Sequence, residues 1–252
     1  MKILVLAKQV PATTDLTFGD AGILNRDNVP KAVNPDDESA IELAIQIAES
    51  NSGEVHLASM GPESSSEMLS ELGAMGCACS YHICDTLLVG ADLITTANVF
   101  AELAKKINVD MVICGASAAD GKGGLLPSAI ASLLGWSCVN QVSSVEEISE
   151  NPTVVFNFGN NKSKAKITGS CVLSVYKTVA EPRIPDVMAV LSAPQPEKLT
   201  VADLNISEKI LDSKGRSEVL KVENVKKERK NKIWEGMDSF SEFLDALKKE
   251  GF

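Results

Sequence analysis

Short apolar runs alternate with amphipathic segments along the first half of the chain. The runs that predict strands lie at residues 2–7, 55–60, 79–84 and 111–114. Apolar residues at helical spacing follow each run, over residues 35–53, 64–75, 92–107 and 125–134. Strands that alternate with helices are joined by right-handed crossovers, which make the strands parallel. The pattern therefore predicts a doubly wound, mainly parallel α/β fold.

The clearest helix start in the chain lies at residue 34. Asn34 stands at the N-cap position and Pro35 at the first helical position. Asp36, Asp37 and Glu38 then place negative charge where the helix dipole favours it. Apolar residues recur on one face up to the next glycine, so this helix is predicted to pack that face on the sheet.

The pattern changes after residue 139. Two strands, at residues 153–158 and 164–168, flank a Gly159-Asn160-Asn161 turn, and a more apolar strand follows at 172–176. This arrangement predicts a β-hairpin added to the sheet.

The C-terminal part lacks periodicity from residue 193 to about residue 234, where prolines and charges dominate. Such a stretch is either a disordered tail or an arm laid over a partner. An amphipathic helix capped by Asp238 follows, and its apolar stripe consists of Phe240, Phe243, Leu244 and Leu247. Because such an end needs a surface to bury against, we favour the arm. We predict an α/β nucleotide-binding domain at 1–192 and a C-terminal arm and helix for subunit association at 193–252.

Composition narrows the choice of partners. The 252 residues are 44% hydrophobic but only 4% aromatic, which favours the aliphatic core of α/β layers over an all-β sandwich. A net charge of −10 at pH 7 repels nucleic acids and anionic membranes. The chain enters a strand at once, without the layout of a signal peptide, and has no apolar run of roughly eighteen residues. We expect a cytoplasmic protein with no membrane insertion.

Six cysteines and two histidines raise the question of metal or redox chemistry. No CxxC pair occurs, and the C-x-C that begins at Cys77 fits no common zinc or cluster spacing. Cys114 stands in an apolar strand, where a reduced thiol behaves as a small hydrophobe. His56 and His82 also fall in strands, with no Ser-His-Asp or paired-histidine arrangement around them. We predict structural side chains, no metal site and no catalytic residue.

The candidate site lies where the fourth strand runs into a glycine-rich loop that opens a helix. Gly121, Gly123 and Gly124 let backbone amides approach an anion closely. The helix that follows, at 125–134, directs its positive end at the same place. The loop therefore predicts a nucleotide site.

Several segments, in their order and spacing, resemble the β subunit of electron transfer flavoproteins over nearly the whole chain. They are Ala7-Lys8-Gln9-Val10-Pro11, Val33-Asn34-Pro35-Asp36-Asp37, Met60-Gly61-Pro62, Ala74-Met75-Gly76, Gly90-Ala91-Asp92 with Thr96, Cys114-Gly115 with Ala118-Ala119-Asp120-Gly121, Leu133-Leu134-Gly135-Trp136, and Glu181-Pro182-Arg183 with Pro185. Each segment alone is a weak signal, whereas the set is specific.

The resemblance implies a flavodoxin-like or HUP-type domain without catalysis of its own, paired with a larger α subunit that carries a redox-active FAD. In the family, the C-terminal arm of the β subunit embraces the α subunit. The β nucleotide site holds a structural AMP or, in members that split electron pairs from NADH, a second FAD. The heterodimer passes electrons between acceptors and acyl-CoA-type or other flavin dehydrogenases.

The same resemblance implies the residues of each contact. Those implied for the nucleotide are Ala7 and Lys8, with Asn34 and Asp37 near it, Met60 on the adenine side, and Thr96, Cys114, Gly115, Ala118, Asp120, Gly121, Lys122, Gly123, Gly124, Leu125 and Leu126 around the ribose and phosphates. Those implied at the start of the segment that contacts the dehydrogenase are Glu181, Pro182 and Arg183.

The loop departs from the family's usual Asp-Gly-Asp-Thr, with Gln two residues later, at Lys122, Gly123 and Leu125. Two side-chain partners for a ligand are thereby lost, so a member without a nucleotide is one reading. Against it, an ammonium in place of a carboxylate favours anions, since one charge pair at 4 Å is worth about 4 kcal/mol at a dielectric near 20. Gly123 and Gly124 add backbone donors. We therefore expect pyrophosphate to bind better than a single phosphate, which favours FAD over AMP, unless Lys122 only projects into solvent.

Two other functions are compatible with the same superfold. One is an adenine-nucleotide-binding module without a redox function. The other is an adenylyl-transfer or hydrolytic enzyme, which needs a catalytic histidine or a pyrophosphatase-type loop that the sequence does not display. We predict an electron-carrier subunit, with a simple carrier and an NADH-dependent bifurcating complex as its two open forms.

Overall fold

The protein is described from a computed structural model. The structure describes residues 1–12, 29–211, 233–236 and 239–249. These residues fall into two units, of which the first holds those up to residue 211 and the second the rest.

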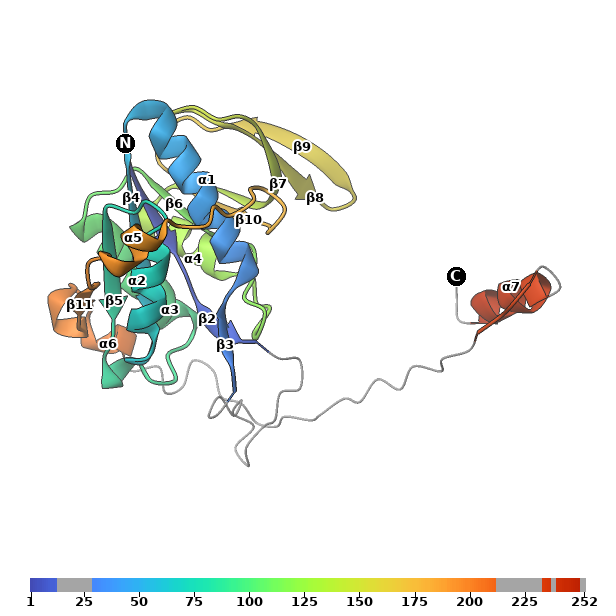
Figure 1. Ribbon diagram of the computed structural model, residues 1–252, viewed down its shortest axis with the longest axis horizontal. Helices are drawn as coiled ribbons and strands as arrows, with labels where there is room; N and C mark the ends of the chain where they lie inside the picture. Colours follow the sequence, from blue (N-terminus) through green and yellow to red (C-terminus); the bar gives the residue numbers. More distant parts are fainter. Residues whose placement is uncertain (13–28, 212–232, 237–238, 250–252) are drawn as a thin grey trace. The chain divides into compact units, whose positions relative to one another are not determined.

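The first unit is built on one nine-stranded sheet (Figure 1). Its strands are β1 (Lys2–Leu6), β4 (Glu54–Met60), β5 (Cys79–Ile83), β6 (Met111–Gly115), β7 (Ser137–Glu147), β8 (Thr153–Phe158), β9 (Asn161–Lys166), β10 (Cys171–Val175) and β11 (Glu197–Leu199). They follow the order β11-β5-β4-β1-β6-β10-β7-β8-β9, parallel from β11 to β7 and antiparallel beyond it. The predicted parallel fold with an added hairpin is confirmed. A separate antiparallel pair consists of β2 (Gln9–Pro11) and β3 (Lys31–Val33).

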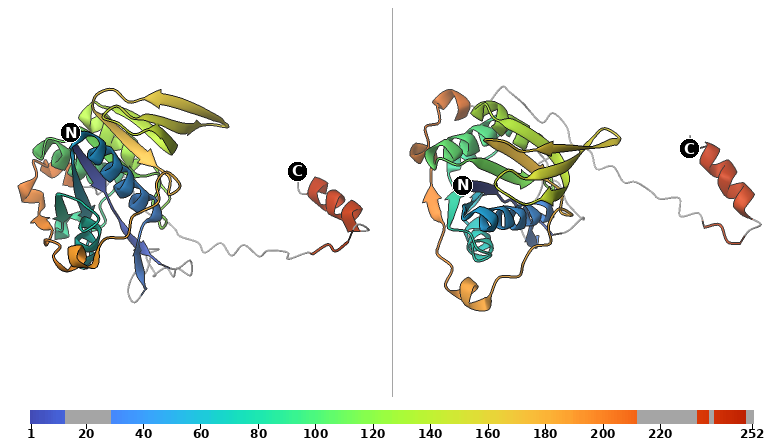
Figure 2. Two further views of the ribbon diagram at one scale, coloured as in Figure 1. Left: turned by 45° about the horizontal axis from the view of Figure 1, so that its top comes forward. Right: turned by 90° about the horizontal axis from the view of Figure 1, so that it is seen from above.

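Helices cover both faces of the sheet, as the two further views show (Figure 2). The helices of this unit are α1 (Pro35–Asn51), α2 (Ser65–Gly73), α3 (Leu93–Lys106), α4 (Leu126–Leu134), α5 (Val187–Leu191) and α6 (Glu208–Leu211), with 3₁₀ turns η1 (Thr86–Leu88) and η2 (Val201–Asp203). Strand β1 explains the two layers, because successive side chains point to opposite faces. Ile3 and Val5 pack with α1 and α2, whereas Leu4 and Leu6 pack with α3 and α4. No described helix is both long and apolar enough to cross a bilayer.

The order of the strands reverses at β1. The chain moves from β1 to β4 and β5 on one side, and then returns to place β6 on the other. In open α/β sheets, ligands bind in the crevice outside the carboxyl ends of the strands at such a switch point. The carboxyl ends of β1 and β6 therefore mark the place to look for a site.

The helices begin close to the predicted residues, but not every residue at an N-cap position makes a capping hydrogen bond. The predicted cap of α3 is present, since Asp92 Oδ1 accepts a hydrogen bond from Thr95 N at 2.8 Å. Asn34 occupies the N-cap position of α1, yet its side chain makes no capping hydrogen bond. It serves the neighbouring loop instead, as described below.

The first unit extends past residue 192, where we placed the end of the α/β domain. Strand β11 pairs in parallel with β5, and Leu199, Val201 and Leu204 are buried in the core beside α3. The strand is only three residues long, too short for a periodic signal. The start of the segment predicted as an arm therefore belongs to the sheet.

The second unit contains α7 (Phe240–Lys249), at the place where the apolar stripe predicts a helix. The ring of Trp234 meets that of Phe243 edge-on, with 5.4 Å between centroids. Within the described residues, no side chain of α7 is buried, and Phe240 and Leu244 are exposed. The predicted cap, Asp238, lies outside the described residues. Helix α7 thus has the predicted apolar stripe, with Phe240 and Leu244 at its surface.

Truncation after residue 194 should destabilise the first unit, because it removes β11 and three buried hydrophobic side chains. We expect a loss of roughly 5 kcal/mol in the free energy of unfolding. Truncation after residue 211 spares these residues and should leave the urea midpoint of the unit unchanged. Equal midpoints for the two truncated chains would contradict the assignment of β11 to the core.

Candidate functional site

The candidate site is assembled at the carboxyl ends of β1 and β6. Lys8 follows β1, the first turn of α1 stands beside it, and residues 115–125, here called the glycine loop, connect β6 to α4. The structure thereby brings together predicted site residues from three separate stretches of sequence. The contacts between these stretches are described next.

Asn34 ties the glycine loop to the start of α1. Its Oδ1 accepts a hydrogen bond from Ala119 N at 3.1 Å, and its Nδ2 donates to Ser117 O at 3.0 Å. Its backbone N–H donates to Lys8 O at 3.0 Å. The side chain is buried, and its bonds to the loop explain why it makes no capping bond to the backbone of its own helix. The predicted N-cap position of Asn34 is confirmed, but its side chain bonds the loop.

Asp37 holds the two strand ends together. Its buried carboxylate accepts one hydrogen bond from Lys8 N at 2.9 Å and one from Gly115 N at 3.0 Å. The approach of β6 is so close that a Cβ on Gly115 would lie 2.3 Å from Asp37 Oδ1, which only glycine avoids. Burial raises the pKa of Asp37 to about 7, although hydrogen bonds from Asn34 and the two backbone donors oppose it.

Asp36 is a residue of the candidate site that we did not predict. Its carboxylate accepts hydrogen bonds from Ser117 N at 3.3 Å and from Lys177 N at 2.9 Å, after β10. In the sequence we interpreted this acid only as a partner of the helix dipole. A doubled aspartate directly after Asn34-Pro35 offers more acceptors than the first turn needs, which is the signal that could have found it.

An ion pair joins the residue after β1 to the glycine loop. Lys8 Nζ contacts both carboxylate oxygens of Asp120, at 2.7 and 2.9 Å. The Asp120 side chain is 2% exposed, whereas that of Lys8 is 42% exposed. One negative charge of the loop is therefore offset within the protein, while the ammonium remains accessible from solvent.

The tip of the glycine loop is open to solvent. Residues 121–125 are all exposed and lead directly into α4, whose first turn has backbone N–H groups without partners inside the helix. Lys122 adopts a left-handed conformation, with φ +50°, and its N–H donates to Ala118 O at 2.8 Å. Leu125 stands at the N-cap position of α4, outside the helix that we started there. This tip is the part of the loop that an anion can reach.

Lys8 and Met60 share a pocket of about 270 Å³ beside the crevice. Its walls also include Pro11, Lys31 and Pro62, from β2, β3 and the turn after β4. Lys31 was not predicted, because its strand is too short to recognise. The pocket combines apolar walls with two cationic side chains.

Other predicted residues lie apart from these contacts or serve packing. The Thr96 hydroxyl donates to Asp92 O within α3 at 2.9 Å. Ala7 is buried and its N–H donates to Ala58 O of β4. Cys114 is buried, its thiol contacts Leu173 O at 3.6 Å, and burial raises its pKa well above the usual value.

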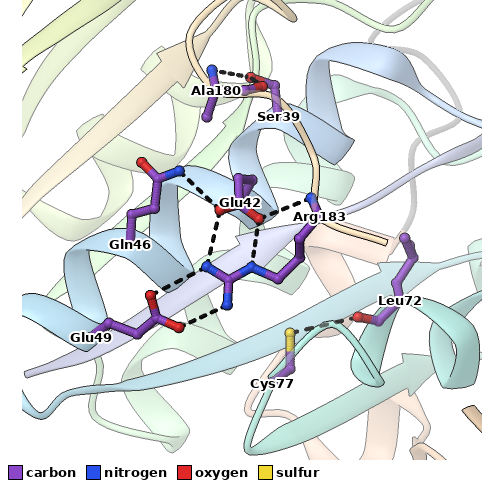
Figure 3. A network of polar contacts seen from close by, with 8 residues as sticks. All are labelled: Ser39, Glu42, Gln46, Glu49, Leu72, Cys77, Ala180 and Arg183. Atoms are coloured by element: carbon purple, nitrogen blue, oxygen red, sulfur yellow. Dashed lines mark hydrogen bonds and ion pairs between the residues drawn. The ribbon is translucent and has the colours of Figure 1, made fainter. Parts of the chain in front are cut away.

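Arg183 lies along α1 instead of at the crevice. Its guanidinium contacts the carboxylates of Glu42 and Glu49, as Figure 3 shows. Its neighbours Glu181 and Pro182 are exposed. The residues predicted to contact a dehydrogenase therefore form a separate place on the molecule.

The chain's thiols and imidazoles form no reactive cluster in the described residues. The six cysteines are free, and no group of three or more His, Cys, Asp or Glu side chains could hold a metal ion there. His82 is buried, and His56 is buried against the Tyr81 hydroxyl. The chemistry that the arrangement supports is the binding of an anionic ligand.

The Asp37→Asn variant should change how stability depends on pH. The folded-state pKa of Asp37 is raised, so its contribution is present in full below pH 3.8 and is lost as the pH rises through 7. Between pH 5 and pH 8, the parent should therefore lose roughly 3 kcal/mol relative to the variant. Urea unfolding of both proteins at the two pH values measures this difference. A parent that gains stability over the variant would show that the backbone donors outweigh burial.

Comparison with known proteins places the chain in a family. Residues 21–204 match the model of the electron transfer flavoprotein domain. The β subunit of the electron transfer flavoprotein of Thermoanaerobacterium thermosaccharolyticum is 32% identical over 94% of this chain and 93% of that protein. Subunit CarD of the caffeyl-CoA reductase-Etf complex of Acetobacterium woodii is 34% identical over 77% of the chain and 75% of that protein. The β subunit of Clostridium acetobutylicum is 29% identical over 90% and 88%. The chain therefore belongs to the electron transfer flavoprotein family, among its β subunits, and functions in electron transfer.

Proposed function

We propose that the crevice at the ends of β1 and β6 holds an adenine nucleotide, FAD, with AMP as the alternative occupant. The observation that carries this proposal is the glycine loop, which Asn34, Asp36 and Asp37 hold at the topological switch point of the sheet. Exposed loop amides and the start of α4 suit phosphates. The pocket between Lys8 and Met60 suits the adenine end.

The residues of the site divide the work of binding. Gly121, Gly123 and Gly124 would supply backbone donors to the phosphates, and Lys122 the positive charge. Asp37 and Gly115 would set the position of the loop. A bound FAD would supply the redox chemistry through its flavin ring, whereas AMP would supply only a filled site. The chain itself would bind and orient the nucleotide.

Pairing with an α subunit would use the C-terminal end of the chain, which holds α7. Helix α7 presents a stripe of large apolar side chains, none of them buried among the described residues. Such a stripe suits a protein surface. We assign that surface to the α subunit of the same heterodimer, in which the redox FAD would be held.

Residues 184–191, here called the docking segment, would contact a flavin dehydrogenase. Five of its large apolar side chains are exposed, those of Ile184, Val187, Met188, Val190 and Leu191. A contiguous apolar stretch of this kind marks an interaction site. The name of the relative from Acetobacterium woodii includes a caffeyl-CoA reductase, which supports a dehydrogenase of the acyl-CoA type and a bifurcating complex.

Counting the nucleotides of the heterodimer tests the proposal. The chain is co-expressed with its α subunit, the complex is denatured, and released FAD and AMP are measured. We expect two FAD per heterodimer, as electron bifurcation from NADH requires. One FAD with one AMP would identify a simple carrier with the same site. A heterodimer with one FAD and no second nucleotide would overturn the assignment of the crevice.

The Lys122→Glu variant should bind FAD about tenfold more weakly than the parent. An exposed charge pair contributes at most about 1 kcal/mol, and this substitution changes the local charge by two units. The loss should be smaller for AMP, which carries one phosphate. Titration of the nucleotide-free heterodimer with each ligand measures both affinities. Lys162→Glu, an equivalent charge change on exposed β9, is the matched control. Unchanged affinities in Lys122→Glu would mean that this lysine only projects into solvent.

A further inference from the structure

Residues 177–183, here called the strap, lie along α1 in a regular register. After β10, Lys177 N donates to Asp36 Oδ1 at 2.9 Å. Three residues later, the Ser39 hydroxyl bonds both the N–H and the carbonyl of Ala180, each at 3.0 Å (Figure 3). Positions three apart lie on one face of a helix, so each step along the strap meets the next polar side chain of α1.

Arg183 is the third and strongest of these attachments. Its backbone N–H donates to Glu42 Oε2 at 3.1 Å. Its Nε and Nη2 donate to Glu42 at 2.8 and 3.0 Å, and its Nη1 and Nη2 donate to Glu49 at 2.7 and 3.2 Å. Figure 3 shows the guanidinium lying between the two carboxylates, with Gln46 also donating to Glu42. A guanidinium has five N–H donors, and four of them are directed at this helix.

The electrostatics of the cluster hold it in the charged form. The Glu42 side chain is only 5% exposed, and burial alone would raise its pKa. Hydrogen bonds from Arg183 and Gln46 outweigh burial, so the pKa of Glu42 is lowered. Glu49, which is 60% exposed, is the outer member of the cluster and can be altered without opening the core.

The chain leaves the body of the protein directly after Arg183. Ile184 is 94% exposed, and no residue of α5 is buried. Burial resumes only at Pro196, just before β11. Arg183 is therefore the last residue attached to α1 before the docking segment, and β11 is the attachment at the other end.

We propose that Arg183 is a positioning residue for the docking segment, held by Glu42 and Glu49 at the point where the segment leaves α1. The inference rests on the proposed contact between that segment and a flavin dehydrogenase. It differs from a direct contact, because the donors of the guanidinium are already directed at α1. Arg183 affects the partner only by fixing where the docking segment, with its apolar side chains, leaves α1.

Steady-state kinetics separate positioning from direct contact. The heterodimer is assayed with a flavin-dependent acyl-CoA dehydrogenase, and KM for the dehydrogenase and kcat are measured. We expect Arg183→Gln and Glu49→Gln each to raise KM by about three- to tenfold with kcat unchanged. The double variant should be no worse than Arg183→Gln alone, since both changes break one attachment. If Arg183 touches the partner directly, Glu49→Gln only loosens its hold on α1, and KM stays unchanged or falls, which overturns the proposal.

Three further variants make each outcome decisive. Glu102→Gln removes a carboxylate paired with Lys105 on α3, on the other face of the sheet, and should leave KM unchanged. Arg183→Lys keeps the charge without the planar fork, so it should give an intermediate KM and serves if Arg183→Gln fails to fold. Met188→Ser tests the docking segment itself. If KM is unchanged in Met188→Ser, the docking contact is wrong. If KM rises in Met188→Ser but not in Glu49→Gln, only the positioning role of Arg183 is wrong.

Discussion

The buried carboxylate of Asp37 is the interaction on which the site depends. Two neighbouring parallel strands end beside each other, and each end leaves a backbone N–H that needs an acceptor away from water. Asp37 supplies both acceptors, to Lys8 N and Gly115 N, from the first turn of α1. Because the carboxylate must sit against β6, the last residue of that strand has no room for a side chain. The position of the glycine loop follows from this one contact.

Helix α1 extends the same constraint along its length. Its first turn fixes the glycine loop, and the turns that follow fix the strap through Ser39, Glu42 and Glu49. Asp36 takes part in both, since it accepts from Ser117 N in the loop and from Lys177 N in the strap. One rigid element therefore sets the geometry of the proposed nucleotide site relative to that of the docking segment. A simple amphipathic helix would not place polar residues on its packed side. In α1 these residues make the contacts to the glycine loop and to the strap.

The sequence predicts elements that have a regular apolar spacing. It does not predict contacts between residues that lie far apart in the chain. Strands β1, β4, β5 and β6 and their helices follow from apolar spacing, and Asp92 caps α3 as its position indicates. Strand β11 is too short for any period, although it is buried against β5. Asn34 shows the second limit, because its position was correct while its partners lie more than 80 residues away. Arg183 was assigned to a partner by resemblance, and its bonds to Glu42 could not be read from sequence spacing.

The acidic character of the site is compatible with an anionic ligand because each acid faces a donor. Asp36 and Asp37 face backbone N–H groups, and Asp120 faces the ammonium of Lys8. Negative charge near the loop is therefore offset before a phosphate arrives, and burial further favours the neutral form of Asp37. What stays exposed at the tip is Lys122 with its flanking glycines. Lys122, one of the three positions at which this loop departs from the usual family sequence, is thus the charge that the tip would present to the proposed ligand.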